Sequence, residues 1–172
     1  MVALLELEDE RSRVRLVPDL GGAIADMDAK LSGRLAPVLR RWDGPQTGWI
    51  GVGSNILVPF SNRISGGGFY FDQGGSATFH PLHPNVENLD PFPLHGDGLL
   101  KSWQVVSHSS TDVILRLVNG EIGDFLYTAE VRYLLSSGTL NITLRVTNKG
   151  IRLPFGGGFH PWLPRYSDTR LQ

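Results

Sequence analysis

The sequence predicts an all-β protein, an antiparallel β-sandwich with long loops. Three observations predict it: several runs alternate apolar and polar residues, glycine is abundant, and only one short stretch has helical potential. Alternation with a period of two is the pattern of a strand with one buried face. Glycine, at 21 of 172 residues or about 12%, exceeds its typical ~7% and favours turns. This length fits one domain, so we expect residues 1–172 to form a single β-sandwich domain.

The first part of the chain is expected to begin with a pair of strands. Residues 3–8 and 13–17 form this pair, with a turn at Asp9-Glu10-Arg11. The second strand is expected to end at residues 18–22, where proline, aspartate and two glycines give a strong turn signal. Residues 35–42 are the one candidate for a short helix, which Pro37 limits.

The clearest strands lie further along the chain. Residues 103–106 make one run, and residues 113–118 are apolar on nearly all positions, as expected of a more central strand. Residues 127–133 and 140–147 both alternate, and Ser136-Ser137-Gly138 between them supplies a tight connection. These last two runs are therefore expected to form an antiparallel hairpin.

Charge and composition exclude several classes of function. Sixteen basic and 17 acidic residues give a net charge of −1, so no overall field attracts nucleic acid or an anionic membrane. The apolar runs are far shorter than the ~20 residues that span a bilayer. The apolar start of the chain meets Glu6 at once, which does not resemble a secretory signal, so we expect a cytoplasmic location. The absence of cysteine excludes disulfide scaffolds and thiolate metal sites.

Three loops carry candidate functional residues. Residues 58–68 read VPFSNRISGGG, residues 93–98 read PLHGDG, and residues 153–163 read LPFGGGFHPWL. Each places polar or ionisable side chains among glycines and prolines, which set the backbone shape rather than fill a core. Functional groups on loops above a rigid sheet are typical of binding sites.

These motifs resemble those of the aldose 1-epimerase (galactose mutarotase) family. The resemblance rests on Asn62-Arg63 in PFSNRI, His95-Gly96 in PLHG, and the Phe155-to-Pro161 segment PFGGGFHP, in the family's order and spacing. It extends over essentially the whole chain. It implies a galactose mutarotase-like β-supersandwich and the interconversion of the α and β anomers of a free aldose, without any cofactor or metal.

The resemblance also implies roles for individual residues. His160 corresponds to the general acid that protonates the ring oxygen, and His95 to a residue that binds the sugar and fixes its ring. Asn62 and Arg63 correspond to substrate-binding residues. The chemistry agrees, because a histidine with a pKa near 6.5 exchanges protons around neutral pH. An amide beside a guanidinium also offers the donors and acceptors that sugar hydroxyls need.

The chain departs from the family pattern at its C-terminal end. The family's general base is a glutamate and a further aspartate binds hydroxyls; both positions would come after Gln172. We therefore expect a sandwich that is incomplete at the C-terminus and, for this chain alone, little enzymatic activity. Asp97, which follows His95-Gly96, is a weak substitute candidate for the base. An incomplete sandwich leaves sheet edges uncovered, which predicts self-association.

Other interpretations remain open for the same residues. The chain is alternatively a non-catalytic carbohydrate-binding or sensing domain on the same scaffold. Arg63 is alternatively the partner of a carboxylate, Asn62 a turn residue, and Trp162 a loop anchor rather than a platform for a sugar.

Two further alternatives concern a metal ion and a phosphate. His80 and His83, with His95, hint at a metal site, but residues three apart on a strand face opposite sides. A sugar-phosphate substrate would need a basic cluster, for which Arg40-Arg41 and the pair Arg11 and Arg13 are the nearest candidates.

Overall fold

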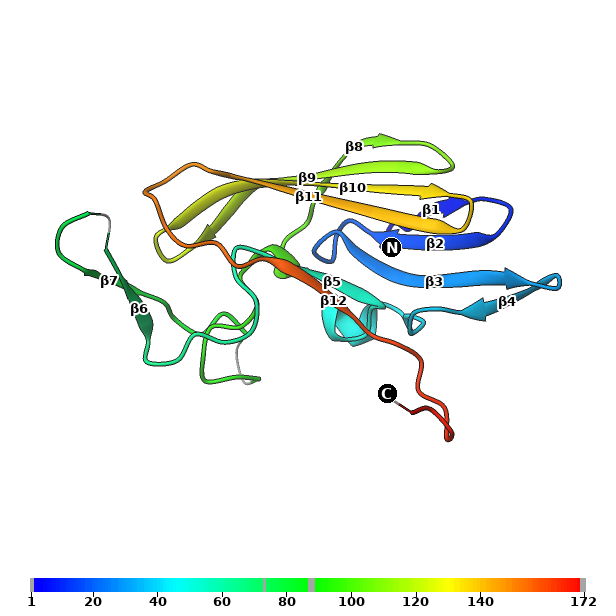
Figure 1. Cartoon of the computed structure of the whole chain (residues 1–172), viewed down its shortest axis with the longest axis horizontal. Coiled ribbons are helices and arrows are strands. Elements are labelled where there is room, and N and C mark those ends of the chain that lie inside the picture. Colours follow the sequence, from blue (N-terminus) through cyan, green and yellow to red (C-terminus); the bar gives the residue numbers. More distant parts are fainter. Residues whose placement is uncertain (1, 73, 87–88, 171–172) are drawn as a thin grey trace.

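The structure is a computed structural model that describes residues 2–72, 74–86 and 89–170. It is built almost entirely from antiparallel strands, as Figure 1 shows, and so confirms the all-β class. The elements in chain order are β1 (Leu5–Glu8), β2 (Ser12–Val17), β3 (Ala23–Leu31), β4 (Arg34–Pro37), the 3₁₀ segment η1 (Pro45–Ile50), β5 (Ser54–Leu57), β6 (Gly68–Phe71), β7 (Thr78–Pro81), the 3₁₀ turn η2 (Gly98–Leu100), β8 (Gln104–His108), β9 (Asp112–Ile122), β10 (Phe125–Ser136), β11 (Thr139–Asn148) and β12 (Gly158–Pro161).

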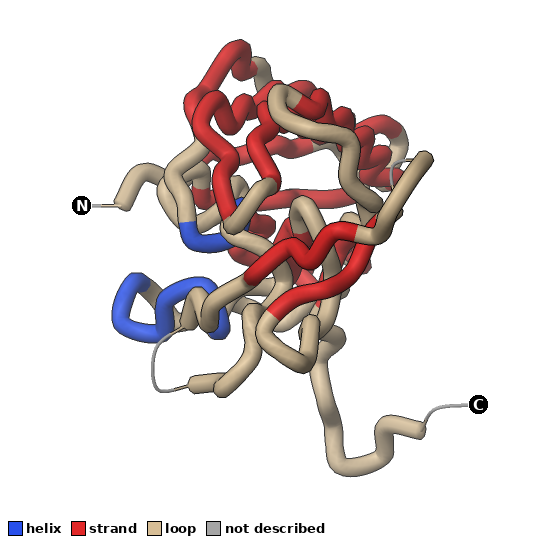
Figure 2. The backbone as a smooth tube through the Cα atoms, turned by 90° about the vertical axis from the view of Figure 1, so that its left-hand side faces the viewer, coloured by secondary structure: helices blue, strands red, loops and turns tan. Residues whose placement is uncertain are grey.

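Two sheets form the layers of a sandwich. The first has the strand order β1-β2-β3-β5-β12, with β4 added beside β3, and the second has the order β11-β10-β9-β8. A hairpin of β6 and β7 forms a separate pair and projects from one end of the molecule (Figure 1). Figure 2 shows the last described residues extending away from the sheets.

The hydrophobic core lies between the two sheets. Alternate positions of β10 point inward, and Tyr127, Ala129, Val131, Tyr133 and Leu135 are all buried there. The same alternation on β11 was visible in the sequence, and the predicted hairpin is confirmed, with Ser136 opposite Thr139. Burial of these apolar side chains is the main source of stability at about 25 cal/mol per Å².

Two sequence-based expectations are wrong in detail. Residues 34–37 form strand β4 instead of starting a helix, because their backbone pairs with the far end of β3, Leu31 opposite Arg34. The segment expected to be a loop at residues 153–163 contains strand β12, which pairs with β5.

Strand β3 was not anticipated because it carries two buried acids, Asp26 and Asp28. Each faces an arginine directly across the ladder, Arg15 opposite Asp26 and Arg13 opposite Asp28. These cross-strand ion pairs compensate the burial of charge. In the described part of the chain, no helix has the length and apolar character needed to cross a bilayer.

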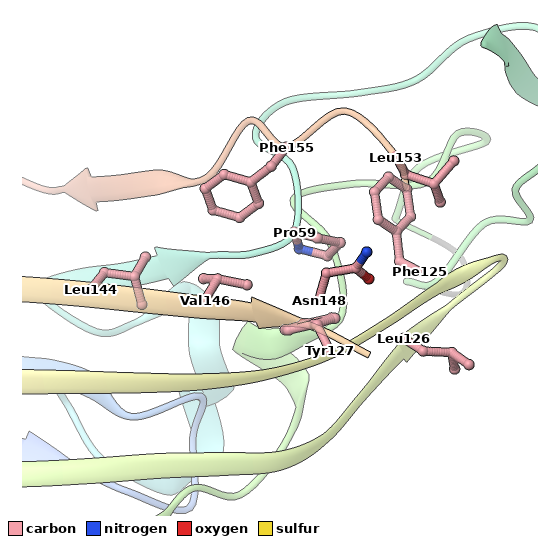
Figure 3. A pocket seen from close by; sticks show the side chains of 9 residues that line it. All are labelled: Pro59, Phe125, Leu126, Tyr127, Leu144, Val146, Asn148, Leu153 and Phe155. Atoms are coloured by element: carbon pink, nitrogen blue, oxygen red, sulfur yellow. The ribbon is translucent and has the colours of Figure 1, made fainter. Parts of the chain in front are cut away.

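One side of the sandwich is open between the edge strands β11 and β12. The inward side chains of β11 are only half-buried there. An apolar cavity of about 240 Å³ lies on this side, and Figure 3 shows the side chains that line it. Its lining residues are Pro59, Phe125, Leu126, Tyr127, Leu144, Val146, Asn148, Leu153 and Phe155.

Candidate functional site

His160 is held by the short strand β12. Its backbone pairs with Asn55 of β5, and Pro161 pairs with Ser54. The next residue, Trp162, donates its backbone N–H to the Gly53 carbonyl at 2.8 Å. The histidine expected on a loop is therefore fixed to the edge of a sheet.

His95 is held by a different device, a left-handed backbone conformation with φ of 60°. Its N–H donates to the Asn62 carbonyl at 2.9 Å, and its ring Nδ1 accepts the Asn62 N–H, also at 2.9 Å. A ring nitrogen that accepts a hydrogen bond carries no proton, so the neutral imidazole carries its proton on Nε2. The next position requires glycine, because a Cβ on Gly96 would lie 1.9 Å from the Val58 carbonyl oxygen.

The two histidines meet at one cleft. Their ring centroids are 5.4 Å apart and the rings meet edge to face at 79°. The cleft has a volume of about 310 Å³, which is at the lower end for small-molecule sites. It is lined by Trp49, Ile50, Asn55, Leu57, Arg63, Leu89, Leu94, His95, His160 and Trp162.

Three of the four expected site residues line this cleft: His95, His160 and Arg63. Asn62 is not among the lining residues; its backbone orients His95, and its φ of 58° also makes it a turn residue. No carboxylate is among the described residues that line the cleft.

The electrostatic environment favours a neutral His95. Burial lowers the pKa of His95 most, and the positive charges of His160 and Arg63 lower it further, while Asp90 opposes the shift. A neutral ring with its proton on Nε2 is suited to donate a hydrogen bond to an oxygen in the cleft.

Arg63 is paired with a carboxylate that the sequence did not reveal. Its Nε donates to Asp90 Oδ2 at 2.5 Å, and its Nη1 lies 3.4 Å from the Asn62 side-chain oxygen. Burial raises the pKa of Asp90, but the hydrogen bonds from the Phe92 N–H and from Arg63 outweigh it, and the pKa lies below its ordinary value. Arg63 is thus the partner of a carboxylate, as one interpretation of the sequence predicted, and half of its side chain stays exposed.

Asn55 and Trp162 complete the polar and aromatic lining. Asn55 is 3% exposed, and its Nδ2 donates to the Trp49 carbonyl at 3.1 Å. Its Oδ1 has no hydrogen-bond partner among the described residues. Trp162 stacks on His160 with 4.9 Å between centroids and 21° between planes. Trp162 follows His160 by two residues, and side chains two apart in an extended backbone lie on the same face. Only this spacing could have indicated the contact from the sequence.

Asp97 is removed from the cleft. Its carboxylate accepts hydrogen bonds from the Tyr127 hydroxyl at 2.5 Å and the Glu121 N–H at 2.8 Å, and it pairs with Lys101 at 2.7 Å. Asp97 is 6% exposed and is not among the cleft-lining residues, so its role is structural.

His80 is also engaged elsewhere. Its Nδ1 lies 2.8 Å from Asp124 Oδ2, and its ring packs on Phe69. Within residues 2–72, 74–86 and 89–170, no three histidine or acidic side chains are grouped to hold a metal ion.

Three of the four basic residues considered for a phosphate are occupied as well. Arg13 and Arg41 both pair with the buried Asp28, at 2.9 and 2.6 Å. Arg40 contacts the Trp162 ring and backbone carbonyls. The described cleft lining contains a single arginine, Arg63.

Comparison with protein families decides the family of this chain. The model for aldose 1-epimerase matches residues 3–172. The chain belongs to the aldose 1-epimerase family. This confirms the resemblance carried by the three motifs, and the two-sheet architecture agrees with it.

Several individual proteins are similar to this chain. It is 44% identical over 117 residues to the uncharacterized protein YphB of Escherichia coli K12. These 117 residues are 67% of this chain and 38% of YphB. A crystal structure of a putative aldose 1-epimerase from E. coli K12 superposes with a TM-score of 0.83 at 33% identity, over 95% of this chain and 53% of that one. A galactose mutarotase-like protein from Lactobacillus casei shares the fold, with a TM-score of 0.67 at 21% identity, over 92% and 49%. The chain thus spans about half the length, or less, of these relatives.

Proposed function

We propose that the cleft binds a free aldose and that this chain contributes the acid and binding residues for the exchange of its α and β anomers. The observation that carries the proposal is the edge-to-face meeting of His95 and His160 beside Arg63 in one cleft. Family membership supports the same reaction class.

The reaction needs two proton transfers. The C1 hydroxyl loses its proton to a base, the bond between C1 and the ring oxygen breaks, and an acid protonates that oxygen. The resulting aldehyde rotates about the C1–C2 bond, and the reverse steps close the ring on the other face. We assign the acid to His160 and a hydrogen bond from Nε2 to the sugar to His95. The exposed part of the Arg63 guanidinium donates to hydroxyls.

The described lining of the cleft supplies no general base. A carboxylate is absent from the described cleft lining, and the matched relatives are about twice as long as this chain. We therefore expect this chain alone to accelerate mutarotation little, and polarimetry on fresh α-glucose or α-galactose measures it. Acceleration at the level of a complete enzyme would contradict this expectation.

Sugar binding is testable without catalysis. We expect galactose or glucose to shift the imidazole NMR signals of His95 and His160 in a saturable way. His108 on β8 is a matched control, because its ring contacts the Glu6 carbonyl and is not among the residues that line the cleft. Equal shifts at all three rings, or none at His95 and His160, would count against the cleft as the sugar site.

A second candidate function is carbohydrate binding without catalysis, which the lack of a carboxylate among the described residues that line the cleft favours. Acetate, supplied as an external base, distinguishes the two. If the acid machinery is functional, acetate is expected to accelerate mutarotation more in the wild type than in His160→Gln. Saturable sugar binding with identical acetate effects in both proteins would favour the binding domain.

We also propose that the chain self-associates through the open side, where β11 is an edge strand with half-buried apolar residues. A Val146→Lys substitution places a charge on this side and is expected to shift the protein toward monomer in size-exclusion chromatography with light scattering. A monomeric wild type would contradict the proposal. A cytoplasmic location stays a prediction of the sequence.

A further inference from the structure

Arg40 is connected to His160, the candidate acid, through one intermediate residue, Trp162. The Arg40 guanidinium carbon is 4.6 Å from the centroid of the Trp162 ring. Trp162 in turn stacks on His160 at 4.9 Å. A guanidinium at this distance is attracted to the electron-rich face of an indole, so Arg40 favours one position of the Trp162 ring.

The guanidinium is itself fixed to the wall of the cleft. Its Nη2 donates to the Val52 carbonyl at 2.9 Å and also to the Ile50 carbonyl. Ile50 lines the cleft at the end of η1. The planar guanidinium can bond carbonyls and lie against an aromatic ring at the same time, which a lysine ammonium does less well.

The backbone of Arg40 adds a second connection. Its N–H donates to the Trp162 carbonyl at 2.8 Å, and the Trp162 N–H donates to Gly53 at 2.8 Å. The backbone therefore places Trp162, while the guanidinium acts on its ring. Trp162 is 38% exposed, so its own burial does not fix the ring completely.

We propose that Arg40 is a positioning residue for His160: through Trp162 it holds the imidazole in the orientation from which a proton reaches the cleft. The proposal rests on the role proposed above for His160. It also gives a role to Arg40, which a sugar-phosphate site would have needed as an unpaired cation.

The test reads the ring of His160 directly. In the wild type, the stacked Trp162 shifts the His160 ring protons upfield, and Trp162→Leu gives the position without the stack. Arg40→Met is expected to lose more than half of this upfield shift, and Arg40→Lys an intermediate part of it. Arg34→Met is the matched control, since Arg34 is an exposed arginine on β4, and it is expected to leave the shift unchanged.

Each result decides one question. A His160 signal in Arg40→Met and Arg40→Lys equal to the wild type would overturn the positioning role. If Arg40→Met does not fold, the Arg40→Lys spectrum alone gives the decision, with the His108 signal reporting the intact fold.

The readout needs no sugar, so it separates this proposal from the proposed function. If Arg40→Met loses the stack and the wild type fails to bind galactose, the proposed function is rejected and the positioning of the His160 ring by Arg40 is kept. In a sugar-binding protein, Arg40→Lys is further expected to lower the acetate-assisted rate more than the affinity.

Discussion

Two polar regions of the molecule differ in how completely their groups are hydrogen-bonded. Around Asp97, both carboxylate oxygens have partners: the Tyr127 hydroxyl on one, and the Glu121 N–H and Lys101 on the other. At the cleft, the equally buried Asn55 leaves its side-chain oxygen without a partner among the described residues. Buried polar groups are normally paired, so a saturated cluster is explained by the fold, whereas an unsaturated group beside a cleft points to a ligand or water.

The largest expected effect comes from breaking the saturated cluster. Asp97→Ala removes the acceptor of the Glu121 N–H, leaves the Tyr127 hydroxyl only the Val58 carbonyl at 3.2 Å, and leaves Lys101 without its carboxylate partner. Burial and the Asp97 carboxylate both raise the pKa of Tyr127, which keeps its hydroxyl a donor that needs an acceptor. We expect a loss of about 3–5 kcal/mol in the free energy of unfolding, measured by urea denaturation.

Asn55→Ala is the matched change at the cleft. It removes one hydrogen bond, to the Trp49 carbonyl, and is expected to cost only about 1 kcal/mol. Similar losses for Asp97→Ala and Asn55→Ala would remove the energetic difference between the two regions. Asp97→Asn, which keeps the size and one acceptor, is expected to fall between them.

The backbone that carries His95 allows a second comparison, with effects expected to be smaller than that of Asp97→Ala. Gly96 and Gly67 have nearly the same φ, 71° and 73°, but a Cβ at Gly96 would meet the Val58 carbonyl at 1.9 Å, whereas Gly67 has open space. Gly67→Ala is expected to cost about 1–2 kcal/mol for the left-handed conformation alone. Gly96→Ala is expected to cost more in thermal or urea unfolding, and to move the His95 NMR signals. Equal costs would show that the close approach to Val58 does not constrain the loop.

The sequence predicted the parts of the fold whose local pattern matches their environment. The hairpin of β10 and β11 was predictable because apolar residues alternate and a glycine connects them. Strand β3 was missed because Asp26 and Asp28 interrupt its apolar pattern, so no strand was predicted between residues 23 and 31. Both acids are buried, and their partners Arg15 and Arg13 lie on the neighbouring strand.

The candidate site divides in the same way. Short motifs revealed His95, His160 and Arg63, because they combine reactive side chains with glycine and proline. Asn55 and Arg40 carry no such local signal. Asn55 reaches the cleft only through the pairing of β5 with β12, and Arg40 contacts Trp162, a lining residue 122 positions later in the chain. Asp90 was likewise identifiable as the partner of Arg63 only in three dimensions.

The smallest expected effect is a pH dependence that comes from the cleft alone. Burial, His160 and Arg63 hold the pKa of His95 below its ordinary value in the folded state. The unfolded chain therefore binds more protons at His95, and stability is expected to fall as the pH drops below about 6.5, the pKa of an unperturbed histidine. Protonation also turns Nδ1 into a donor that faces the Asn62 N–H, so the hydrogen bond between them is lost.

Urea unfolding between about pH 7 and about pH 5 measures this dependence. Over this range His95→Gln is expected to lose less stability than the wild type, while the control His108→Gln follows the wild type. Parallel profiles for all three proteins would mean that the cleft leaves His95 as free to ionise as an unfolded histidine, and the contrast with the saturated Asp97 cluster would then not extend to proton binding.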